Sequence, residues 1–291
     1  MTAEHAVDAL AATQPATTAA VLAAARRALA VLGDAAALDA ELLLAAATGR
    51  TRASLLAFPE RGVPAVAVRA LEALIARRAG GEPLAYLLGV REFFSLDLEV
   101  NASVLVPRPE TELLVEAALA RCARLVQPAV LDVGTGSGAI ALAVKSERRD
   151  AQVTGVDTSA AALAVARRNA VRLGLAIRWL ESTWFSAVAG EAFDVIISNP
   201  PYVHSADVVG ALVHEPRQAL DGGPDGLDAY RELLRDAPAH LRAGGALLLE
   251  HGADQRDALA ALAAATGWRV VRALDDLAGR ARVLELERGI A

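Results

Sequence analysis

The chain has 291 residues and a mass of 30.1 kDa, enough for one large or two ordinary domains, which excludes a small disulfide-stapled or fibrous protein. Its hydrophobic fraction is 54%, yet no apolar stretch reaches the roughly 20 residues of a membrane helix. The net charge is −6, and residues 81–291 alone hold 21 basic and 28 acidic residues, which disfavours strong binding to a phosphate backbone.

The compartment follows from the cysteine content and from the first residues. Cys122 is the single cysteine, so the chain can form no internal disulfide. Glu4 and Asp8 stand where a secretory signal carries basic residues. We therefore expect a cytoplasmic protein. We also expect a monomer that acts without direct contact to a membrane or a nucleic acid.

Residues 1–80 predict a small all-α domain of about four or five helices, because apolar residues such as Leu22, Ala25 and Leu29 recur at helical spacing. Cap residues predict helix starts at Thr17, Asp34 and Thr51 and helix ends at Gly33, Gly49 and Gly80. Residues 81–108 change character. Phe93, Leu96, Leu98 and Val100 alternate with polar residues and residues 101–103 resemble a turn, which predicts a β-hairpin linker.

Residues 109–291 alternate short apolar runs with helical patterns. The predicted strands are residues 129–133, 152–156, 176–180, 193–198, 245–250, 269–274 and 281–286. This alternation is typical of an α/β fold with a Rossmann-like, doubly wound parallel sheet. In such sheets a ligand lies beyond the carboxyl ends of the strands, near the point where the strand order reverses.

A glycine-rich turn follows the first of these strands, in the sequence Asp-Val-Gly-Thr-Gly-Ser-Gly at residues 132–138. Glycines let a ligand approach the backbone closely, although such a turn can also be an ordinary strand-to-helix connection. Asp157 ends the next strand, about 20 residues on, where an acidic side chain can hold ribose hydroxyls; alternatively it caps the helix that starts near Ser159. Together they predict an adenosine-type ligand, either a dinucleotide or S-adenosylmethionine.

The sequence Ser-Asn-Pro-Pro-Tyr at residues 198–202 follows the fourth strand. Two prolines provide no backbone donors, so the loop presents carbonyl acceptors, joined by the Asn199 side-chain oxygen and the flat face of Tyr202. Such a loop can bind a planar –NH2 group. Acceptors that favour a pyramidal nitrogen would direct its lone pair toward an electrophilic methyl group.

These motifs together resemble the family of peptide chain release factor glutamine methyltransferases, which are class I S-adenosylmethionine-dependent enzymes. The resemblance extends to Val-Pro-Arg-Pro-Glu-Thr-Glu at residues 106–112, Glu-Pro at residues 215–216 and Leu-Glu-His-Gly at residues 249–252, and it covers nearly the whole chain. It implies methyl transfer from S-adenosyl-L-methionine to the side-chain amide nitrogen (N5) of the glutamine in the Gly-Gly-Gln loop of class I release factors, and thus a role in translation termination.

The resemblance also implies roles for individual residues. The expected catalytic residues are Asn199, Pro200, Pro201 and Tyr202. The expected cofactor-binding residues are Gly134, Thr135, Gly136, Ser137, Gly138, Asp157, Thr158, Trp184 and Asn199. The expected substrate-binding residues add Phe94, Arg108 and Glu110 to the Asn-Pro-Pro-Tyr loop. The chain departs from the family at Thr183, where Asp is usual before the tryptophan, and at Ser95, where Gly is common.

Three other interpretations stay open. The acceptor could be a glutamine of a ribosomal protein, or the chain could methylate adenine in a nucleic acid with Tyr202 stacked on a flipped base. It could also bind S-adenosylmethionine without turnover, as an adaptor. A metal site is not expected, because His5, His204, His214, His240 and His251 lack metal-ligand spacing.

Overall fold

The computed structural model describes residues 15–289, which form two compact units that meet in sequence at Leu88 and Gly89. We call them the helical unit and the sheet unit. The sequence predictions for residues 1–14, including His5 and the first part of the helical domain, lie outside the described residues. Within the described chain, none of the helices combines the length and the apolarity needed to cross a membrane.

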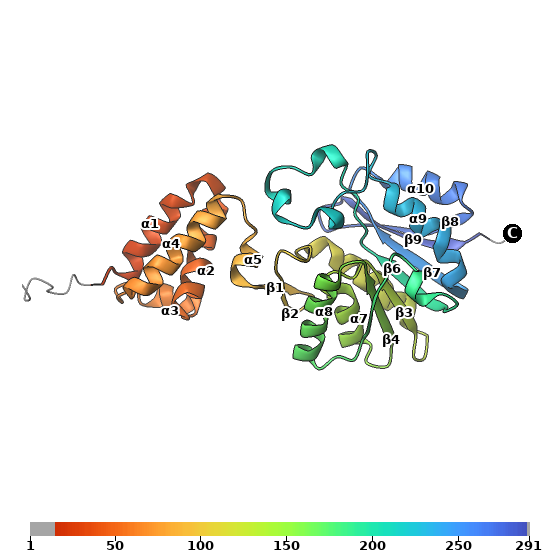
Figure 1. Ribbon diagram of the computed structural model, residues 1–291, viewed down its shortest axis with the longest axis horizontal. Helices are drawn as coiled ribbons and strands as arrows, with labels where there is room; N and C mark the ends of the chain where they lie inside the picture. The colour runs from red at the N-terminus through yellow and green to blue at the C-terminus, as the bar shows by residue number, and fades with distance from the viewer. Residues whose placement is uncertain (1–14, 290–291) are drawn as a thin grey trace, which may run out of the picture. The chain divides into compact units, whose positions relative to one another are not determined.

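The helical unit consists of α1 (Thr18–Ala28), α2 (Ala35–Thr48), α3 (Arg52–Ala57), α4 (Ala65–Ala79) and α5 (Leu84–Leu88), with a 3-10 turn η2 (Ala30–Leu32) (Figure 1). The predicted starts at Thr17 and Thr51 are confirmed, since each side-chain oxygen accepts a hydrogen bond from a backbone N–H three residues later. Gly49 ends α2 with φ 66°, a conformation that favours glycine. Apolar residues of α1, α2 and α4 form one core.

The sheet unit begins with a hairpin of β1 (Val90–Phe93) and β2 (Leu96–Glu99). Its turn is formed by Phe94 and Ser95, both with positive φ, so the turn expected at residues 101–103 is not the hairpin turn. The backbone N–H of Phe94 donates to the Glu112 carboxylate at 2.9 Å, and that of Ser95 donates to Glu92 at 2.7 Å. These carboxylates stabilise a turn that contains no glycine, while residues 101–103 form a separate turn after β2.

A seven-stranded sheet forms the centre of the unit in the order β5-β4-β3-β6-β7-β9-β8. The strands are β3 (Ala129–Val133), β4 (Gln152–Asp157), β5 (Arg178–Glu181), β6 (Phe193–Ser198), β7 (Leu241–Glu250), β8 (Trp268–Asp275) and β9 (Ala281–Arg288). The predicted strands are all present. The sheet is not wholly parallel, however, because β9 runs antiparallel to both of its neighbours. Only residues 276–280 connect β8 to β9, too short a link for a parallel crossover.

Helices cover both faces of this sheet, with α7 and α8 on one side and α9 and α10 on the other (Figure 1). The central strands are buried on both faces, so Val130 of β3 packs into the core that includes α7 whereas Leu131 packs into the core that includes α9. The longer helices are α6 (Glu112–Cys122), α7 (Ala139–Glu147), α8 (Ala160–Leu173), α9 (Asp228–Asp236) and α10 (Arg256–Ala265). The short 3-10 helices are η3 (Pro109–Thr111), η4 (Ser186–Val188), η5 (Ser205–Asp207), η6 (Gly210–His214), η7 (Arg217–Ala219) and η8 (Ala237–His240).

The strand order determines where a ligand can bind. From β3 the chain builds outward through β4 to β5, and β6 then returns to the other side of β3. The order therefore reverses between β3 and β6. The glycine-rich loop after β3 and the Asn-Pro-Pro-Tyr loop after β6 both start at this point, as predicted.

Candidate functional site

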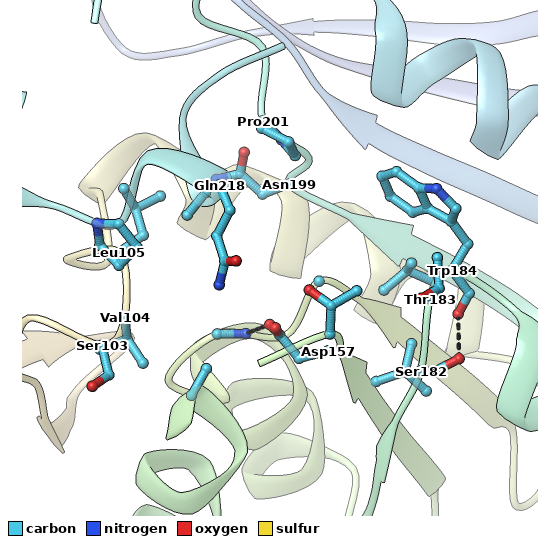
Figure 2. A pocket seen from close by; sticks show the side chains of 18 residues that line it. Ser103, Val104, Leu105, Asp157, Ser182, Thr183, Trp184, Asn199, Pro201 and Gln218 are labelled. Carbon is cyan, nitrogen blue, oxygen red and sulfur yellow. Dashed lines mark hydrogen bonds between the residues drawn. The ribbon is translucent and has the colours of Figure 1, made fainter. Parts of the chain in front are cut away.

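A cavity of about 230 Å³ opens at the carboxyl ends of the parallel strands, and we call it the central cavity. Loops after four neighbouring strands line it, together with the segment after the hairpin and the η7 region (Figure 2). The lining includes Val104, Leu105, Gly134, Gly136, Asp157, Thr158, Thr183, Trp184, Asn199, Pro201 and Gln218. The site is therefore assembled from segments that are far apart in sequence.

The glycine-rich loop leaves its backbone uncovered at this cavity. Gly134 and Gly136 have φ angles of 76° and 55°, and a Cβ at either would meet no atom within 4 Å. A ligand can thus approach both backbones without displacing the protein. Gly138 serves the fold instead, because a Cβ there would come within 2.9 Å of the Trp179 ring.

The buried carboxyl group of Asp132, in β3, stabilises the glycine-rich loop through hydrogen bonds. Asp132 accepts hydrogen bonds from the Thr135 hydroxyl at 2.5 Å and from the Ala141 N–H at 3.2 Å. Burial raises its pKa to about 7. Sequence reasoning missed Asp132, although a charged residue inside the apolar run of β3 was a usable signal.

Asp157 extends from the end of β4 toward the glycine-rich loop. Its Oδ2 accepts from the Gly136 N–H at 2.9 Å (Figure 2), and its Oδ1 accepts from the Ser159 N–H at 2.9 Å. The helix cap is supplied by Ser159, whose hydroxyl oxygen accepts from the Ala162 N–H at 3.1 Å. Asp157 thus orients the loop, and its remaining lone pairs can accept hydrogen bonds from a ligand.

Thr183 and Trp184 form the wall of the cavity on the Asp157 side, opposite Val104 and Leu105 (Figure 2). Trp184 has φ 50°, an uncommon conformation for a bulky residue. The Ser182 hydroxyl stabilises it by donating to the Trp184 carbonyl at 2.9 Å while accepting from the Ala187 N–H at 3.0 Å. This conformation places Trp184 on the lining of the central cavity, next to Thr183.

The Asn-Pro-Pro-Tyr loop lies between the central cavity and a second cavity of about 120 Å³, which we call the side cavity. The side cavity is lined by Leu105, Arg108, Asn199, Pro200, Tyr202, Val203, Leu212, Ala219 and Leu220. Asn199 lines both cavities. Leu105 and Ala219 also line both cavities, but of these three residues Asn199 alone has a polar side chain that two ligands could share.

Polar groups behind the loop fix its geometry. The Asn199 Nδ2 donates to the Thr111 hydroxyl at 3.2 Å, and the Tyr202 hydroxyl donates to the Glu250 carboxyl at 3.4 Å. Burial raises the pKa of Tyr202, so its phenol stays neutral. Glu250 is 1% exposed, and burial raises its pKa to about 7.

Family models and relatives of similar sequence show which protein family this chain belongs to. A model of the methyltransferase small domain matches residues 109–256, and a model of the PrmC N-terminal domain matches residues 20–89. A release factor glutamine methyltransferase of Burkholderia pseudomallei is 48% identical over 252 residues, which covers 83% of this chain and 88% of the relative. This chain belongs to the release factor glutamine methyltransferase family.

Further comparisons agree with this family. A release factor glutamine methyltransferase of Xylella fastidiosa is 48% identical over 249 residues, covering 84% of this chain and 90% of the relative. The solved structure of a methyltransferase from Pyrococcus furiosus has a TM-score of 0.50 at 22% identity, covering 68% of this chain and 91% of that chain, a likeness that concerns the fold alone. The predicted family and the predicted methyltransferase fold are confirmed.

In this member of the release factor glutamine methyltransferase family, the two cavities bring together most of the predicted site residues. Gly134, Gly136, Asp157, Thr158, Trp184, Asn199 and Pro201 line the central cavity, while Arg108, Asn199, Pro200 and Tyr202 line the side cavity. Thr135, Ser137 and Gly138 belong to the loop but face the protein interior or cap α7. Phe94 lies at the hairpin turn, and Glu110 lines a separate surface pocket with Leu277.

Two further residues at the site were given no role from the sequence, although Glu215 belongs to a motif that carries the family resemblance. The Gln218 side chain extends into the central cavity toward Asp157 (Figure 2). Glu215 is buried, pairs with the Arg108 guanidinium and accepts from the Val106 N–H at 3.0 Å. It therefore ties the Val-Pro-Arg-Pro segment to the region of η6 and η7. Both residues fall in irregular segments, where periodicity carries no signal.

A metal site is absent from the described part of the chain, in the sense that no three His, Cys, Asp or Glu side chains there are arranged to hold an ion.

Proposed function

We propose that this chain transfers a methyl group from S-adenosylmethionine to the side-chain amide nitrogen (N5) of the glutamine in the Gly-Gly-Gln loop of class I release factors, and so modulates translation termination. The observation that carries the proposal is the position of Asn199 on both cavities. A cofactor in the central cavity and an amide in the side cavity would have their reacting groups at the same side chain. The curated relatives, named as release factor glutamine methyltransferases, support this acceptor.

The residues of the central cavity fit the cofactor. The bare backbone at Gly134 and Gly136 would hold its amino-acid part, the lone pairs of Asp157 could accept from its ribose hydroxyls, and the indole of Trp184 would lie by its adenine. Thr183 provides a hydroxyl where the family usually has a carboxylate, and it can accept a hydrogen bond from the adenine amino group. When bound, S-adenosylmethionine supplies an electrophilic methyl group on a positively charged sulfur.

The residues of the side cavity fit a glutamine amide. Its two N–H bonds can be donated to the Asn199 side-chain oxygen and to the Pro200 carbonyl, since Pro200 and Pro201 have no backbone N–H that would compete. An amide nitrogen is a poor nucleophile because its lone pair is delocalised into the carbonyl. Acceptors that favour a pyramidal nitrogen localise this lone pair, and the interaction is strongest in the transition state.

The titratable groups around the Asn-Pro-Pro-Tyr loop are either neutral or form an ion pair. The Tyr202 phenol is neutral, and the Arg108 guanidinium pairs with Glu215. A strongly anionic wall would stabilise a sulfonium reactant more than the transition state, in which that positive charge is being lost. Neutral acceptors at Asn199 avoid this penalty, and catalysis then depends largely on the relative positions of the two reactants.

We further propose that the helical unit recognises the release factor, that Phe94, Arg108 and Glu110 contribute to the substrate surface, and that the protein acts as a monomer in the cytoplasm without binding nucleic acid. The acidic balance of residues 81–291 supports the last point.

The experiment is transfer of labelled methyl from S-adenosylmethionine to a purified class I release factor, next to the same factor with its Gly-Gly-Gln glutamine changed to alanine. We expect label on the first and none on the second. Label on both would mean another acceptor residue. Label on neither, with cofactor binding shown by calorimetry, would refute the proposed acceptor and direct the assay to ribosomal proteins and then to nucleic acid.

A further inference from the structure

Two buried residues near Asn199, Thr111 and Glu250, come from parts of the sheet unit that are far apart in sequence. Thr111 ends η3, and Glu250 ends β7, so they are 139 positions apart in sequence. Their side chains are nevertheless buried together, Thr111 at 4% and Glu250 at 1% exposure. Neither reaches a cavity wall, since both are absent from the lining of the central and side cavities.

The hydroxyl of Thr111 interacts with both Asn199 and Glu250. It accepts a hydrogen bond from Asn199 Nδ2 at 3.2 Å. The hydroxyl also lies close enough to the Glu250 carboxyl to lower its pKa against the effect of burial. Glu250 Oε2 is buried and has no hydrogen-bond partner in the described chain, so it is the oxygen that needs the Thr111 proton.

The donor and acceptor inventory of these groups sets the direction of each hydrogen bond. An ionised carboxylate only accepts, and a hydroxyl has a single proton. If Thr111 gives its proton to Glu250, its oxygen is left only as an acceptor toward Asn199. The Asn199 side chain must then turn its NH2 toward Thr111 and its carbonyl oxygen away from it.

The same carboxyl also holds the far end of the loop. The Tyr202 hydroxyl donates to Glu250 Oε1 at 3.4 Å, and the Tyr230 hydroxyl donates to the Glu250 backbone carbonyl at 2.8 Å. Gln255 Nε2 donates to the Tyr202 carbonyl at 3.0 Å. Tyr230 thus anchors the backbone of Glu250. The Glu250 carboxyl in turn lies next to Tyr202 at one end of the Asn-Pro-Pro-Tyr loop and next to Thr111, which contacts Asn199 at the other end.

We propose that Thr111 and Glu250 are positioning residues that fix the orientation of the Asn199 amide, so that its oxygen and not its NH2 meets the amide of the substrate glutamine. The inference rests on the proposed function, because it names what sets the acceptor that this reaction needs. A flipped Asn199 would oppose one NH2 group with another and lose the interaction.

The first test compares kcat for methylation of the release factor in Thr111→Val, Thr111→Ser and Glu250→Gln variants. Valine keeps the shape of threonine and removes the hydroxyl, so we expect kcat to fall about tenfold, the value of one hydrogen bond. Serine restores the hydroxyl and should restore kcat. The amide introduced by Glu250→Gln can donate a hydrogen bond to Thr111. The Thr111 hydroxyl is then free to donate to Asn199 and can bind its oxygen, so this variant should also lower kcat. The dissociation constant for S-adenosylmethionine should stay within about twofold.

A matched control is Thr154→Val. Thr154 is a second buried threonine of the same sheet unit, its hydroxyl accepts from Arg178 Nε at 3.2 Å, and it lines neither cavity. We expect its kcat to be unchanged. A fall similar to that of Thr111→Val would mean that the loss reflects packing.

A double-mutant cycle separates positioning from a direct role. In an Asn199→Ala background Thr111→Val should have no further effect, because the residue acts only through Asn199. An equal loss in both backgrounds, or a failure of serine to restore kcat, would overturn the proposal.

A third measurement does not depend on the acceptor protein. The side-chain NH2 of Asn199, assigned by its absence in the spectrum of Asn199→Ala, should exchange slowly with deuterium in the wild type and in Thr111→Ser, and at least tenfold faster in Thr111→Val. Equal exchange in all variants would refute the orientation. If the wild type does not methylate the release factor, the proposed function fails, whereas this exchange still decides whether Thr111 holds the amide.

Discussion

The burial of Glu250 makes the stability of the sheet unit depend on pH. Burial raises the pKa of this carboxyl from its ordinary 4.5 to about 7, so the folded state binds the proton more tightly than the unfolded state. The stability that comes from this preference is fully present below pH 4.5 and is lost as the pH rises to about 7. Burial outweighs Thr111, Arg282 and Tyr202, which lower the pKa of this carboxyl, and Glu110 raises it further.

The size of the effect follows from that pKa difference. A difference of about 2.5 pKa units corresponds to about 3 kcal/mol of unfolding free energy. Glu250→Gln removes the ionisation, so the variant should lack this loss. Relative to the wild type, it should therefore gain about 3 kcal/mol between pH 4.5 and pH 8. Asp132 titrates in the same range but is present in both proteins, so its contribution cancels.

The assay is urea unfolding of wild type and Glu250→Gln from pH 4.5 to pH 8, followed by tryptophan fluorescence. The three tryptophans, Trp179, Trp184 and Trp268, all belong to the sheet unit, so the signal reports on this unit. Glu147→Gln is the control, since Glu147 is exposed and its curve should follow that of the wild type. Parallel stability curves for Glu250→Gln and wild type would refute the reasoning.

Three other substitutions test the site and its support. Asn199→Ala should leave the melting temperature unchanged and lower turnover by more than about tenfold, and near-normal turnover would contradict its role. Asn169→Ala removes three hydrogen bonds to backbone groups of β2 and of Ser137, so the unfolding free energy should fall by about 3 kcal/mol in urea; a fall below about 1 kcal/mol would mean that water replaces them. Gly155→Ala places a Cβ 2.4 Å from the Trp179 ring and should cost about 1 to 3 kcal/mol by thermal unfolding, and an unchanged melting temperature would show that the ring can move.

Local chemistry made much of the architecture predictable. The strands Ala129–Val133 and Phe193–Ser198 have the predicted bounds, because each is a mostly apolar run that ends at a glycine or an Asn-Pro sequence. The cap residues Thr17 and Thr51 act through their own side chains, so their effect is visible in the sequence. The direction of β9 was also within reach, since the length of the preceding link excludes a crossover.

Contacts between distant segments were not predictable. The hairpin turn at Phe94 depends on a carboxylate of α6, and nothing in the two turn residues themselves indicates a positive φ. The arrangement of Thr111, Glu250 and Asn199 likewise exists only once η3, β7 and β6 are packed together. For the same reason the sequence motifs named the loop that carries Asn199 but could not show what orients its side chain.

The loop at Pro200 and Pro201 offers carbonyl acceptors, and this affects how the site treats a substrate whose glutamine has deamidated to glutamate. Two consecutive prolines present carbonyl oxygens and no N–H groups, and the guanidinium of Arg108 beside them already pairs with Glu215. A carboxylate in the side cavity has no N–H group to donate to the Asn199 side-chain oxygen or the Pro200 carbonyl, and a site built for hydrogen-bond donors rejects such a ligand strongly. A release factor whose glutamine has deamidated should thus bind poorly in the side cavity, because its acceptors are left without donors, although glutamate has nearly the same shape as glutamine.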